Sequence, residues 1–383
     1  MTPHYIPMPL NIINLKNILL SIISILLFTS NNLSAQTSSP FSGLEHLFTK
    51  PKSYILYHAE SPLKIDGELD EKAWTAAPWS EYFGDIEGDI RPAPAHKTRV
   101  KMLWDDKYMY IAAQMEEPHI WANKRPEQDK IFRDNVFKIF IDPDNSMNDD
   151  FEMQINPQNN MLFLIMNKPY RDGGIPVTGW VPIGLQSAVK INGTINNSSD
   201  TDSDWIAEIA IPLASLNFNP RDAKQKEGLR LNFLRTGFDF TVKDGIYSKA
   251  LDSAGKAIPP HYASWSSQGL INMHYPERWG YTVFSGNSPE NKTAEFILPY
   301  SEKQRAYLWL AYYRQKDWQK KNKTYAGSLQ QLNIPENDII IDGRKNQLKQ
   351  EATDRQFLVT ISDEDGKSSQ TINQDGAIVS GNR

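Results

Sequence analysis

Oxygen-bearing side chains occupy every second position of one short loop. Asp142, Asp144, Ser146, Asn148 and Asp150 follow an apolar run that has the pattern of a strand. Calcium takes six to eight oxygen ligands, and alternate positions of a tight loop can direct their side chains to one point. The spacing therefore predicts a structural calcium site with Asp142, Asp144, Asn148 and Asp150 as ligands.

A second loop repeats this spacing with Asp200, Asp202 and Asp204. Neither loop has the glycine that lets an EF-hand loop turn sharply or the glutamate that closes it. Asp, Asn and Ser are also common in hydrated turns, for reasons unrelated to metals. Each loop thus has two interpretations, a calcium site or a solvated turn.

The remaining candidates for chemistry are carboxylates. The sequence contains no GxSxG elbow, no HExxH pair and no phosphate-binding glycine loop. Glycoside hydrolysis needs two carboxyl groups that flank one bond. If the protein is a glycosidase, Glu152 and Glu208 are its candidate catalytic residues. We interpret both as structural or ligand-binding and expect no catalysis.

Short segments of alternating apolar and polar residues, separated by Gly, Pro, Asn and Asp, run from residue 53 to about 286. Many short strands at regular spacing are typical of an antiparallel β-sandwich. We predict an all-β domain over 53–286, with two antiparallel sheets of the immunoglobulin-like or jelly-roll type. Within it, Glu152, Gln154 and Asn156 alternate along one strand and project from the same face.

The first 35 residues have the pattern of an export signal. A lysine precedes a short apolar run, and small residues follow at Leu33-Ser34-Ala35. The run is shorter than the ~20 residues that a membrane-spanning helix needs. We predict removal of residues 1–35 and a secreted or periplasmic mature chain without a membrane span.

The composition limits the kinds of site and of binding partner that the protein can have. The chain has no cysteine, which excludes disulfides, thiol catalysis and thiolate metal sites. Its formal net charge of −5, with charges of both signs interspersed, argues against nucleic acid as a partner. Oligomeric state is not determined by these features.

The pattern changes after residue 286. Apolar and aromatic residues at helical spacing predict an amphipathic helix at about 301–330, packed on the sandwich. Residues 331–354 are polar and are interpreted as a linker. Two strand-like runs around an Asp-Glu-Asp-Gly turn predict a β-hairpin at about 356–379.

Several phrases in order resemble the carbohydrate-binding module family 9-like domains of exported bacterial proteins. These phrases are KIDGELDEKAW (64–74), LWDDKYMY (103–110), EPHIWA (117–122), FIDPD (140–144), NKPYRDGG (167–174), WIAEIAIP (205–212) and HYPERWGY (274–281). The resemblance covers about residues 60–285. It implies a two-sheet β-sandwich, a carbohydrate ligand and structural calcium.

The resemblance also implies that tryptophans stack on a sugar while polar side chains bind its hydroxyls. We predict Trp121 and Trp180 as the stacking residues. Arg125 and Arg133 are predicted to bind ring oxygens, although a surface charge pair is equally compatible with their positions. Glu152, Gln154 and Asn156 would face either a wet, ligand-binding concavity or plain solvent.

One position departs from the family. Lys138 stands where the family usually places an acidic residue before the Ile-Phe-Ile-Asp phrase. This reversal of charge predicts a ligand different from that of a standard family 9 module.

The resulting hypothesis is an exported, non-catalytic protein that binds a polysaccharide or its oligosaccharides, of the plant-type xylan or glucan class, during polysaccharide breakdown. A glycoside hydrolase is the first alternative. A structural cell-surface protein that uses the domain for protein contacts is the second.

Overall fold

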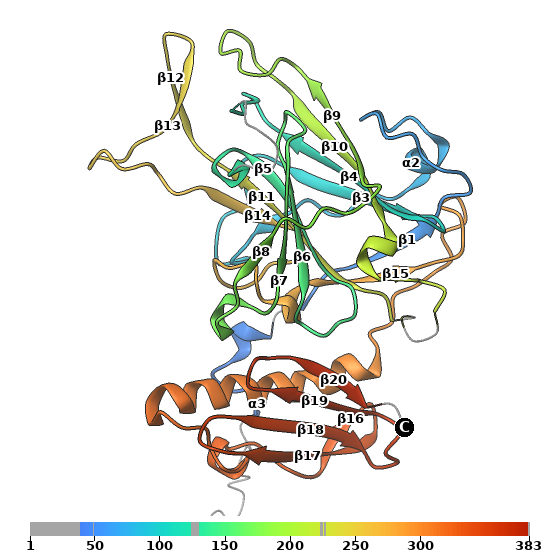
Figure 1. Ribbon diagram of the computed structural model, residues 1–383, viewed down its shortest axis with the longest axis vertical. Coiled ribbons are helices and arrows are strands. Elements are labelled where there is room, and N and C mark those ends of the chain that lie inside the picture. Colours follow the sequence, from blue (N-terminus) through green and yellow to red (C-terminus); the bar gives the residue numbers. More distant parts are fainter. Residues whose placement is uncertain (1–38, 49, 124–129, 223–224, 226, 382–383) are drawn as a thin grey trace, which may run out of the picture. The chain divides into compact units, whose positions relative to one another are not determined.

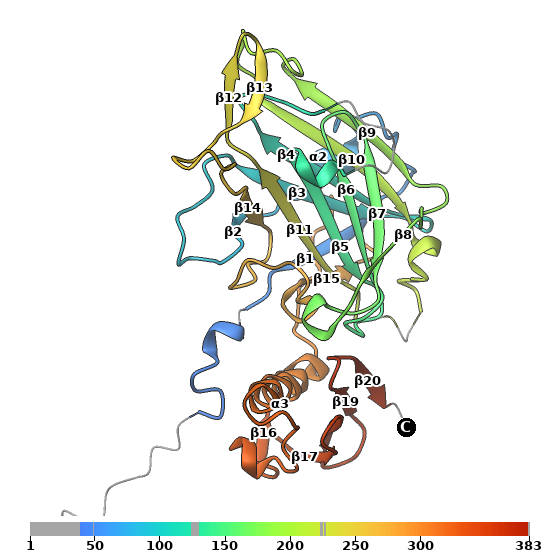
Figure 2. The ribbon, with the colours of Figure 1, turned by 60° about the vertical axis from the view of Figure 1, so that its left-hand side comes forward.

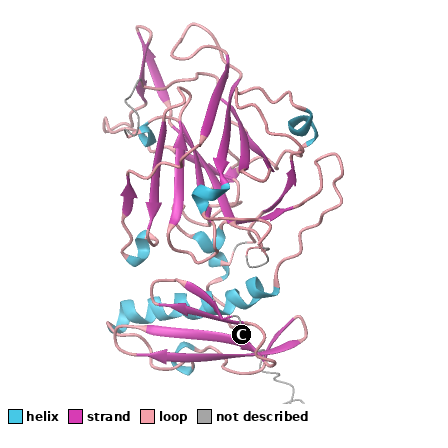
Figure 3. Cartoon of the chain, turned by 45° about the vertical axis from the view of Figure 1, so that its right-hand side comes forward, coloured by secondary structure: helices cyan, strands magenta, loops and turns pink. Residues whose placement is uncertain are grey.

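A computed structural model describes residues 39–48, 50–123, 130–222, 225 and 227–381. The predicted export signal therefore lies outside the described residues. Two compact units divide the chain at Ser42 and Gly43. Everything below concerns the second unit, Gly43–Arg383, which Figure 3 shows to consist mainly of strands.

One curled sheet of 13 strands dominates this unit, in the order β8-β7-β6-β5-β11-β15-β1-β3-β4-β10-β9, with β14 and β2 attached beside β11 (Figure 1). The strands are β1 Ser53–His58, β2 Gly84–Asp85, β3 Thr98–Trp104, β4 Tyr108–Glu116, β5 Val136–Asp142, β6 Asp150–Ile155, β7 Met161–Met166, β8 Pro176–Thr178, β9 Gln186–Asn192, β10 Asp204–Pro212, β11 Arg230–Gly237, β14 His261–Ser264 and β15 Gly280–Phe284. A separate hairpin pairs β12 Phe240–Lys243 with β13 Ile246–Lys249.

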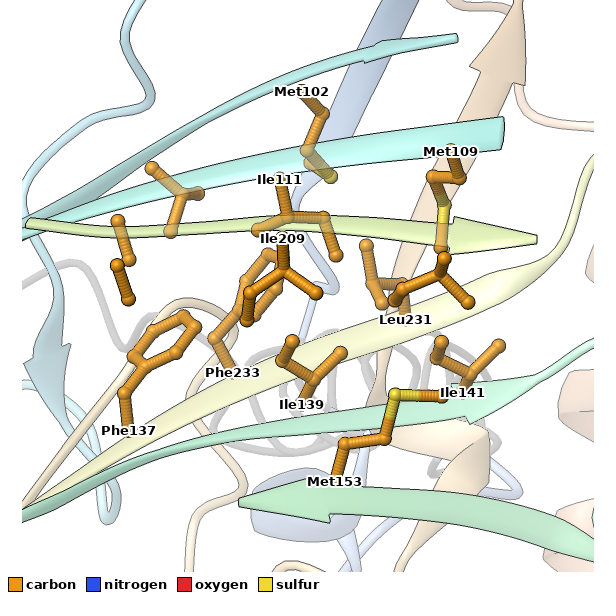
Figure 4. Packing of buried hydrophobic residues seen from close by; sticks show 14 of the residues in the cluster. Met102, Met109, Ile111, Phe137, Ile139, Ile141, Met153, Ile209, Leu231 and Phe233 are labelled. Carbon is orange, nitrogen blue, oxygen red and sulfur yellow. The ribbon is translucent and has the colours of Figure 1, made fainter. Parts of the chain in front are cut away.

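The core lies between two parts of this sheet, which we call the β4 half (β3, β4, β10 and β9) and the β6 half (β5, β6, β7, β8, β11 and β14). Alternate side chains of both halves belong to one buried cluster, because successive residues of a strand point to opposite faces. Figure 4 shows Met102, Ile111 and Ile209 of the β4 half packed against Ile139 and Phe233 of the β6 half.

The prediction of an all-β fold is thus confirmed, but one strand departs from the antiparallel pattern. β1 pairs in parallel with both of its neighbours, β15 and β3. These two pairings connect the halves into a single curled sheet. Sequence periodicity could not reveal this, since parallel and antiparallel strands alternate side chains in the same way.

The C-terminal residues form a helix and a small sheet. Helix α3 spans Tyr300–Asn322 and ends where Lys323 adopts a left-handed backbone conformation (φ 67°), several residues before the predicted end near 330. The sheet has five strands, β16 Ile339–Ile341, β17 Arg344–Ala352, β18 Phe357–Asp363, β19 Ser369–Asn373 and β20 Ile378–Gly381. The linker predicted at 331–354 is wrong, because β16 and β17 both lie within it.

Helix α3 contacts β18 and β19 of the small sheet and also reaches the large one. Tyr312 Oη donates to Asp172 Oδ1 at 2.7 Å, and Arg230 pairs with Glu302. Polar side chains such as Gln304 and Gln315 are buried together with the aromatic ones. A helix enclosed from more than one side needs no polar outer face, which explains why the amphipathic pattern is weak.

None of the helices among the described residues is long and apolar enough to cross a membrane.

Candidate functional site

A pocket of about 710 Å³ lies on the outer face of the β6 half, the face turned away from the core. Figure 2 shows the strands that build its floor, β14, β11, β5, β6, β7 and β8, side by side. Ligand pockets are commonly ~300–1,000 Å³ in volume. The pocket is therefore large enough for a small-molecule ligand.

Strand register fixes the pattern of the floor. Gln154 is paired with Lys138 on one side and Leu162 on the other, and Glu152 is paired with Phe140 and Leu164. All of these side chains share one face because they occupy paired positions of neighbouring strands. A polar centre thus forms on β5 and β6, with apolar side chains beside it.

The polar centre is a linked group around the Glu152 carboxylate. Glu152 Oε1 accepts from Gln154 Nε2 at 2.6 Å and lies 3.4 Å from Lys138 Nζ. Glu152 Oε2 lies 3.5 Å from His274 Nε2. The carboxylate is buried, 4% exposed, and its partners are side chains that line the same pocket. Lys138, the residue that departs from the family pattern, therefore compensates the negative charge of Glu152.

Three polar atoms on this lining have no hydrogen-bond partner among the described residues. They are Gln154 Oε1, His274 Nδ1 and Thr236 Oγ1, and all three are buried. A buried polar atom without a partner costs about 1–3 kcal/mol. Their grouping around one cavity indicates a place where a ligand or water supplies hydrogen bonds.

The lowered pKa of His274 favours a neutral imidazole, which has one nitrogen that can accept a hydrogen bond. Burial lowers the pKa of His274, against the opposing influence of the Glu152 carboxylate. The imidazole is therefore neutral near pH 7. Nε2 faces the Glu152 carboxylate, so a proton on Nε2 would point to Glu152 and leave Nδ1 as an acceptor.

The C-terminal helix holds the two rim segments that carry Tyr170 and His274. Arg171, next to Tyr170, donates to Glu277 Oε1 at 2.7 Å. Glu277 also bonds Tyr313 of α3, while Tyr312 bonds Asp172. The rings of Tyr170 and His274 meet at 4.7 Å in an edge-on contact. The rim is thus fixed from behind by buried charged and phenolic groups.

The sequence predictions for the polar face are placed as follows. Glu152 and Gln154 lie together in the pocket, and Gln154 is 3% exposed, so this face is not a plain solvent face. Asn156 is buried but does not line the pocket. Its Oδ1 accepts from the backbone of Gln158 and Asn160 at 3.1 and 3.0 Å, which shapes the β6–β7 turn.

The two predicted stacking residues lie elsewhere. Trp180 packs against Phe151, with ring centroids 4.5 Å apart, on the core side of the β6 half, opposite Glu152. Trp121 is half-buried and contacts Phe240 of β12 at 4.9 Å. Neither lines the pocket, and the structure does not bring them together with Glu152 and Gln154. Their role in sugar stacking stays a prediction.

The predicted arginines add little to the site as described. Arg133 is exposed at the end of a short 3-10 helix, Ile131–Arg133, whose residue Phe132 lines the pocket. Arg125 lies outside the described residues.

Glu208 occupies the opposite outer face, on the β4 half. Its Oε2 accepts from the backbone N–H groups of Asp66 and Gly67 at 3.0 and 2.9 Å, and its Oε1 accepts from Trp74 Nε1 at 2.8 Å. Burial raises the pKa of Glu208, while these donors act in the other direction. The carboxylate thus fastens the 64–74 segment, including helix α2 Lys72–Ala76, onto the sheet.

Glu152 and Glu208 consequently do not flank one cleft. They project from outer faces that point away from each other, with the core between them. Glu152 is also the one carboxylate among the described residues that line the pocket. Retaining and inverting glycosidases place two carboxyl groups about 5–10 Å apart, so this pair does not fit either geometry.

The first acidic loop combines buried carboxylates that lack full compensation. Asp142 Oδ2 accepts from Met147 N at 3.0 Å, whereas Asp150 Oδ1 has no partner. Burial, followed by repulsion from Asp144, raises the pKa of Asp142 to about 7. Burial and the Asp142 charge likewise raise the pKa of Asp150.

A bound cation would relieve this repulsion, and the oxygen donors suit a hard ion such as calcium. Within the described ranges, however, no group of three or more acidic, His or Cys side chains is arranged to hold a metal ion. Asn148 has an unpartnered Oδ1 in the same loop. Calcium at this loop therefore stays a prediction.

In the second acidic loop, the carboxylates of Asp202 and Asp204 accept hydrogen bonds from the protein itself. Asp202 accepts from Ile120 N and Thr194 N, both at 2.7 Å. Asp204 accepts from the side chains of Asn192 and Ser203, at 2.9 Å each. These bonds tie neighbouring loops together, whereas Asp200 Oδ1 is buried without a partner, so calcium at this loop also stays a prediction.

Sequence reasoning missed His274, Tyr170, Phe132 and the aliphatic side chains of the pocket. The seven histidines are scattered singly along the sequence, so His274 belongs to no local pattern that marks a site. The available signal was its place in the HYPERWGY phrase, but only the fold brings that phrase beside β6.

Two solved structures of a carbohydrate-binding module family 9 from Caldicellulosiruptor kristjanssonii, in complex with cellotriose and with glucose, match this chain at 18% and 16% identity. Each match covers 65% of this chain and 100% of the other, with a TM-score of 0.39. Among curated proteins no match was found.

The sequence profile of the family described as "Carbohydrate family 9 binding domain-like" matches residues 65–286, more than half of the chain. This span contains all seven quoted phrases apart from the first residue of the KIDGELDEKAW phrase, and it contains every strand that forms the pocket floor. The chain therefore belongs to the carbohydrate family 9 binding domain-like family.

Proposed function

We propose that this protein binds a saccharide, without hydrolysing it, in the pocket on the outer face of the β6 half. The observation that carries the proposal is the buried polar centre. Gln154 Oε1, His274 Nδ1 and Thr236 Oγ1 lack partners, and sugar hydroxyls can both donate to and accept from such groups. Membership of a carbohydrate-binding family supports this choice of ligand.

In the proposal, Glu152 accepts hydrogen bonds from ligand hydroxyls, and Lys138 and Gln154 hold it in place. Charge-assisted hydrogen bonds are about twice as strong as neutral ones. Tyr170, 46% exposed, offers a ring at the rim on which the C–H face of a sugar can pack. Stacking on Trp121 or Trp180 is a separate prediction, which concerns surfaces outside the pocket.

We further propose that the mature chain acts outside the cytoplasm, because residues 1–35 have the pattern of an export signal. The ligand class would be a xylan- or glucan-type polysaccharide or its oligosaccharides, used in polysaccharide catabolism. The supporting fold would be a β-sandwich of the immunoglobulin-like or jelly-roll type. Nucleic acid is not an expected partner for a chain of this net charge.

Titration calorimetry with glucose, cellotriose and a xylo-oligosaccharide tests the proposal. We expect binding of at least one of these sugars, and we expect Glu152→Gln to weaken it at least about tenfold, which corresponds to ~1.4 kcal/mol. Glu351→Gln is the matched control, because Glu351 is exposed on β17 of the small sheet.

Absence of binding by the wild-type protein, or equal affinity in the Glu152→Gln variant, would remove this pocket as the site. Release of reducing sugar during the same incubations would instead favour the glycosidase. We expect none, because the pocket offers one carboxylate among its described lining residues.

A further inference from the structure

We propose that the natural ligand of this pocket is an amphipathic saccharide, a sugar that carries an apolar substituent such as an aryl or acyl group. This inference rests on the proposed function and narrows its ligand class. It follows from the arrangement of apolar side chains around the polar centre, which a plain sugar would leave largely unused.

Apolar side chains flank the polar centre on both sides. Leu162 and Leu164 of β7 stand beside Gln154 and Glu152, and Leu234 of β11 is paired with Lys138. Both flanks belong to the lining of one continuous pocket. A ligand that covers the centre therefore extends over at least one apolar flank unless it is small.

The flanks carry Leu162, Leu164 and Leu234 next to the polar centre, and the rings of Phe140, Phe238 and Tyr262 add further apolar surface to the lining. No tryptophan occurs among the described lining residues. Sugar rings pack best on flat aromatic faces, whereas branched aliphatic side chains suit hydrocarbon chains and aryl groups of irregular shape. The floor thus combines a centre that needs hydroxyl groups with flanks that need hydrocarbon.

The rim continues the apolar character into solvent. Phe132 is 43% exposed and Ile271 is 61% exposed, and both line the pocket. Exposed apolar groups that gather at a cavity mark binding sites more often than isolated ones do. Burial of these groups by the substituent would contribute affinity in proportion to the area covered.

The experiment measures the dissociation constants of three ligands that share one sugar. They are methyl, phenyl and octyl β-glucoside, and octyl glucoside is used below its micelle concentration. Each buried methylene contributes about a fourfold gain in affinity. We expect phenyl or octyl glucoside, or both, to bind at least about tenfold more tightly than methyl glucoside. Preference for phenyl would indicate an aryl-substituted polysaccharide as the source, and preference for octyl a glycolipid.

Substitution of a leucine that lines the pocket distinguishes burial of the apolar substituent in the pocket from its non-specific adsorption to the protein surface. Leu164→Thr keeps a strand-compatible side chain and should reduce the ratio of methyl to octyl dissociation constants by about fourfold or more. Leu358→Thr is the matched control, since Leu358 is 46% exposed on β18, away from the pocket, and should leave the ratio unchanged.

The outcomes are distinguishable. Equal affinity for methyl, phenyl and octyl glucoside would overturn the amphipathic ligand and leave the saccharide site intact. A ratio that is unchanged by Leu164→Thr, or reduced equally by Leu358→Thr, would likewise overturn it. Failure of all three glucosides and of the oligosaccharides above would overturn the proposed function itself.

Discussion

Two buried glutamates, on opposite outer faces of the same curled sheet, have contrasting partners. Glu208 receives two backbone N–H groups and an indole N–H from the 64–74 segment. Glu152 is surrounded by the side chains of Lys138, Gln154 and His274, which line a cavity. A carboxylate saturated by its own chain builds structure, whereas one bordered by unpartnered groups is available to a ligand.

The sequence around the two residues follows the same logic. Gly67 has a positive φ of 87°, and an added Cβ would lie 3.0 Å from Lys190 N. Glycine is required there so that the backbone can approach β9 and present its N–H groups to Glu208. On the Glu152 face, Ile86 and the 271–274 segment pack beside Phe140 and Leu234, and a pocket remains next to Glu152.

The largest expected effect is on the free energy of unfolding, when Glu208 is substituted. Glu208→Gln removes the negative charge and brings an amide N–H toward groups that are themselves donors. We expect a loss of about 3 kcal/mol in the free energy of unfolding, measured by chemical denaturation. Glu68→Gln is the control, because Glu68 forms an exposed pair with Lys190 in the same region.

If Glu208→Gln unfolds at the same denaturant concentration as wild type, the 64–74 segment does not depend on this carboxylate. Glu152→Gln should by contrast change the free energy of unfolding by less than Glu208→Gln while weakening sugar binding. Equal destabilisation by the two variants would remove the distinction between a structural and a ligand-binding glutamate.

The second prediction concerns the two faces of the β6 half itself. Trp180→Ala removes an indole that packs with Phe151 and Phe163 on the core side. We expect a loss of about 2 kcal/mol in stability, because large-to-small changes leave a cavity. Sugar binding to the folded variant should persist if Glu152 and its neighbours form the site.

Loss of sugar binding by a folded Trp180→Ala variant, measured well below its melting temperature, would support the stacking role predicted from the sequence. Trp121→Ala, measured in parallel, tests the other half of that prediction.

The third prediction extends the comparison to the buried acids of the first loop. The pKa of Asp142 is about 7 in the folded protein, above its usual value near 4. The folded state therefore binds more protons than the unfolded state between these values. The contribution of Asp142 to stability is therefore greatest below about pH 4, and it decreases as the pH rises through about 7.

Asp142→Asn should consequently stabilise the chelator-treated protein at pH 8 by about 1–3 kcal/mol and have little effect at pH 4. If calcium occupies the loop, added calcium should raise the melting temperature of the wild type but not of the variant. Asp89→Asn is the matched control, because Asp89 is exposed in a turn outside this loop. Identical melting curves with calcium and with chelator would leave the loop as a turn.

Much of the fold could be predicted from local pattern, because strand periodicity records which side chains face a core. Within the span predicted to be all-β, residues 98–104 and 136–142 form β3 and β5. The parallel pairing of β1 and the strands β16 and β17 could not be predicted. Pairing direction depends on where distant segments meet, and polar strands such as β17 resemble linkers.

The site was predicted in part. Alternation placed Glu152 and Gln154 on one face, and that inference required only the period of a strand. Whether the face meets solvent, core or a cavity depends on what covers it. His274 and Tyr170 come from other segments, so no local pattern connects them to β6.

The sequence by itself determined the family, through seven phrases in order, and the all-β character of residues 53–286, through strand periodicity. The tertiary structure decided which of the polar residues are available. It closed the 64–74 segment over Glu208 and left Glu152 beside Lys138 and His274 in an open pocket. The physical reason is that the free energy of a buried charge depends on its neighbours in space, which distant parts of the chain provide.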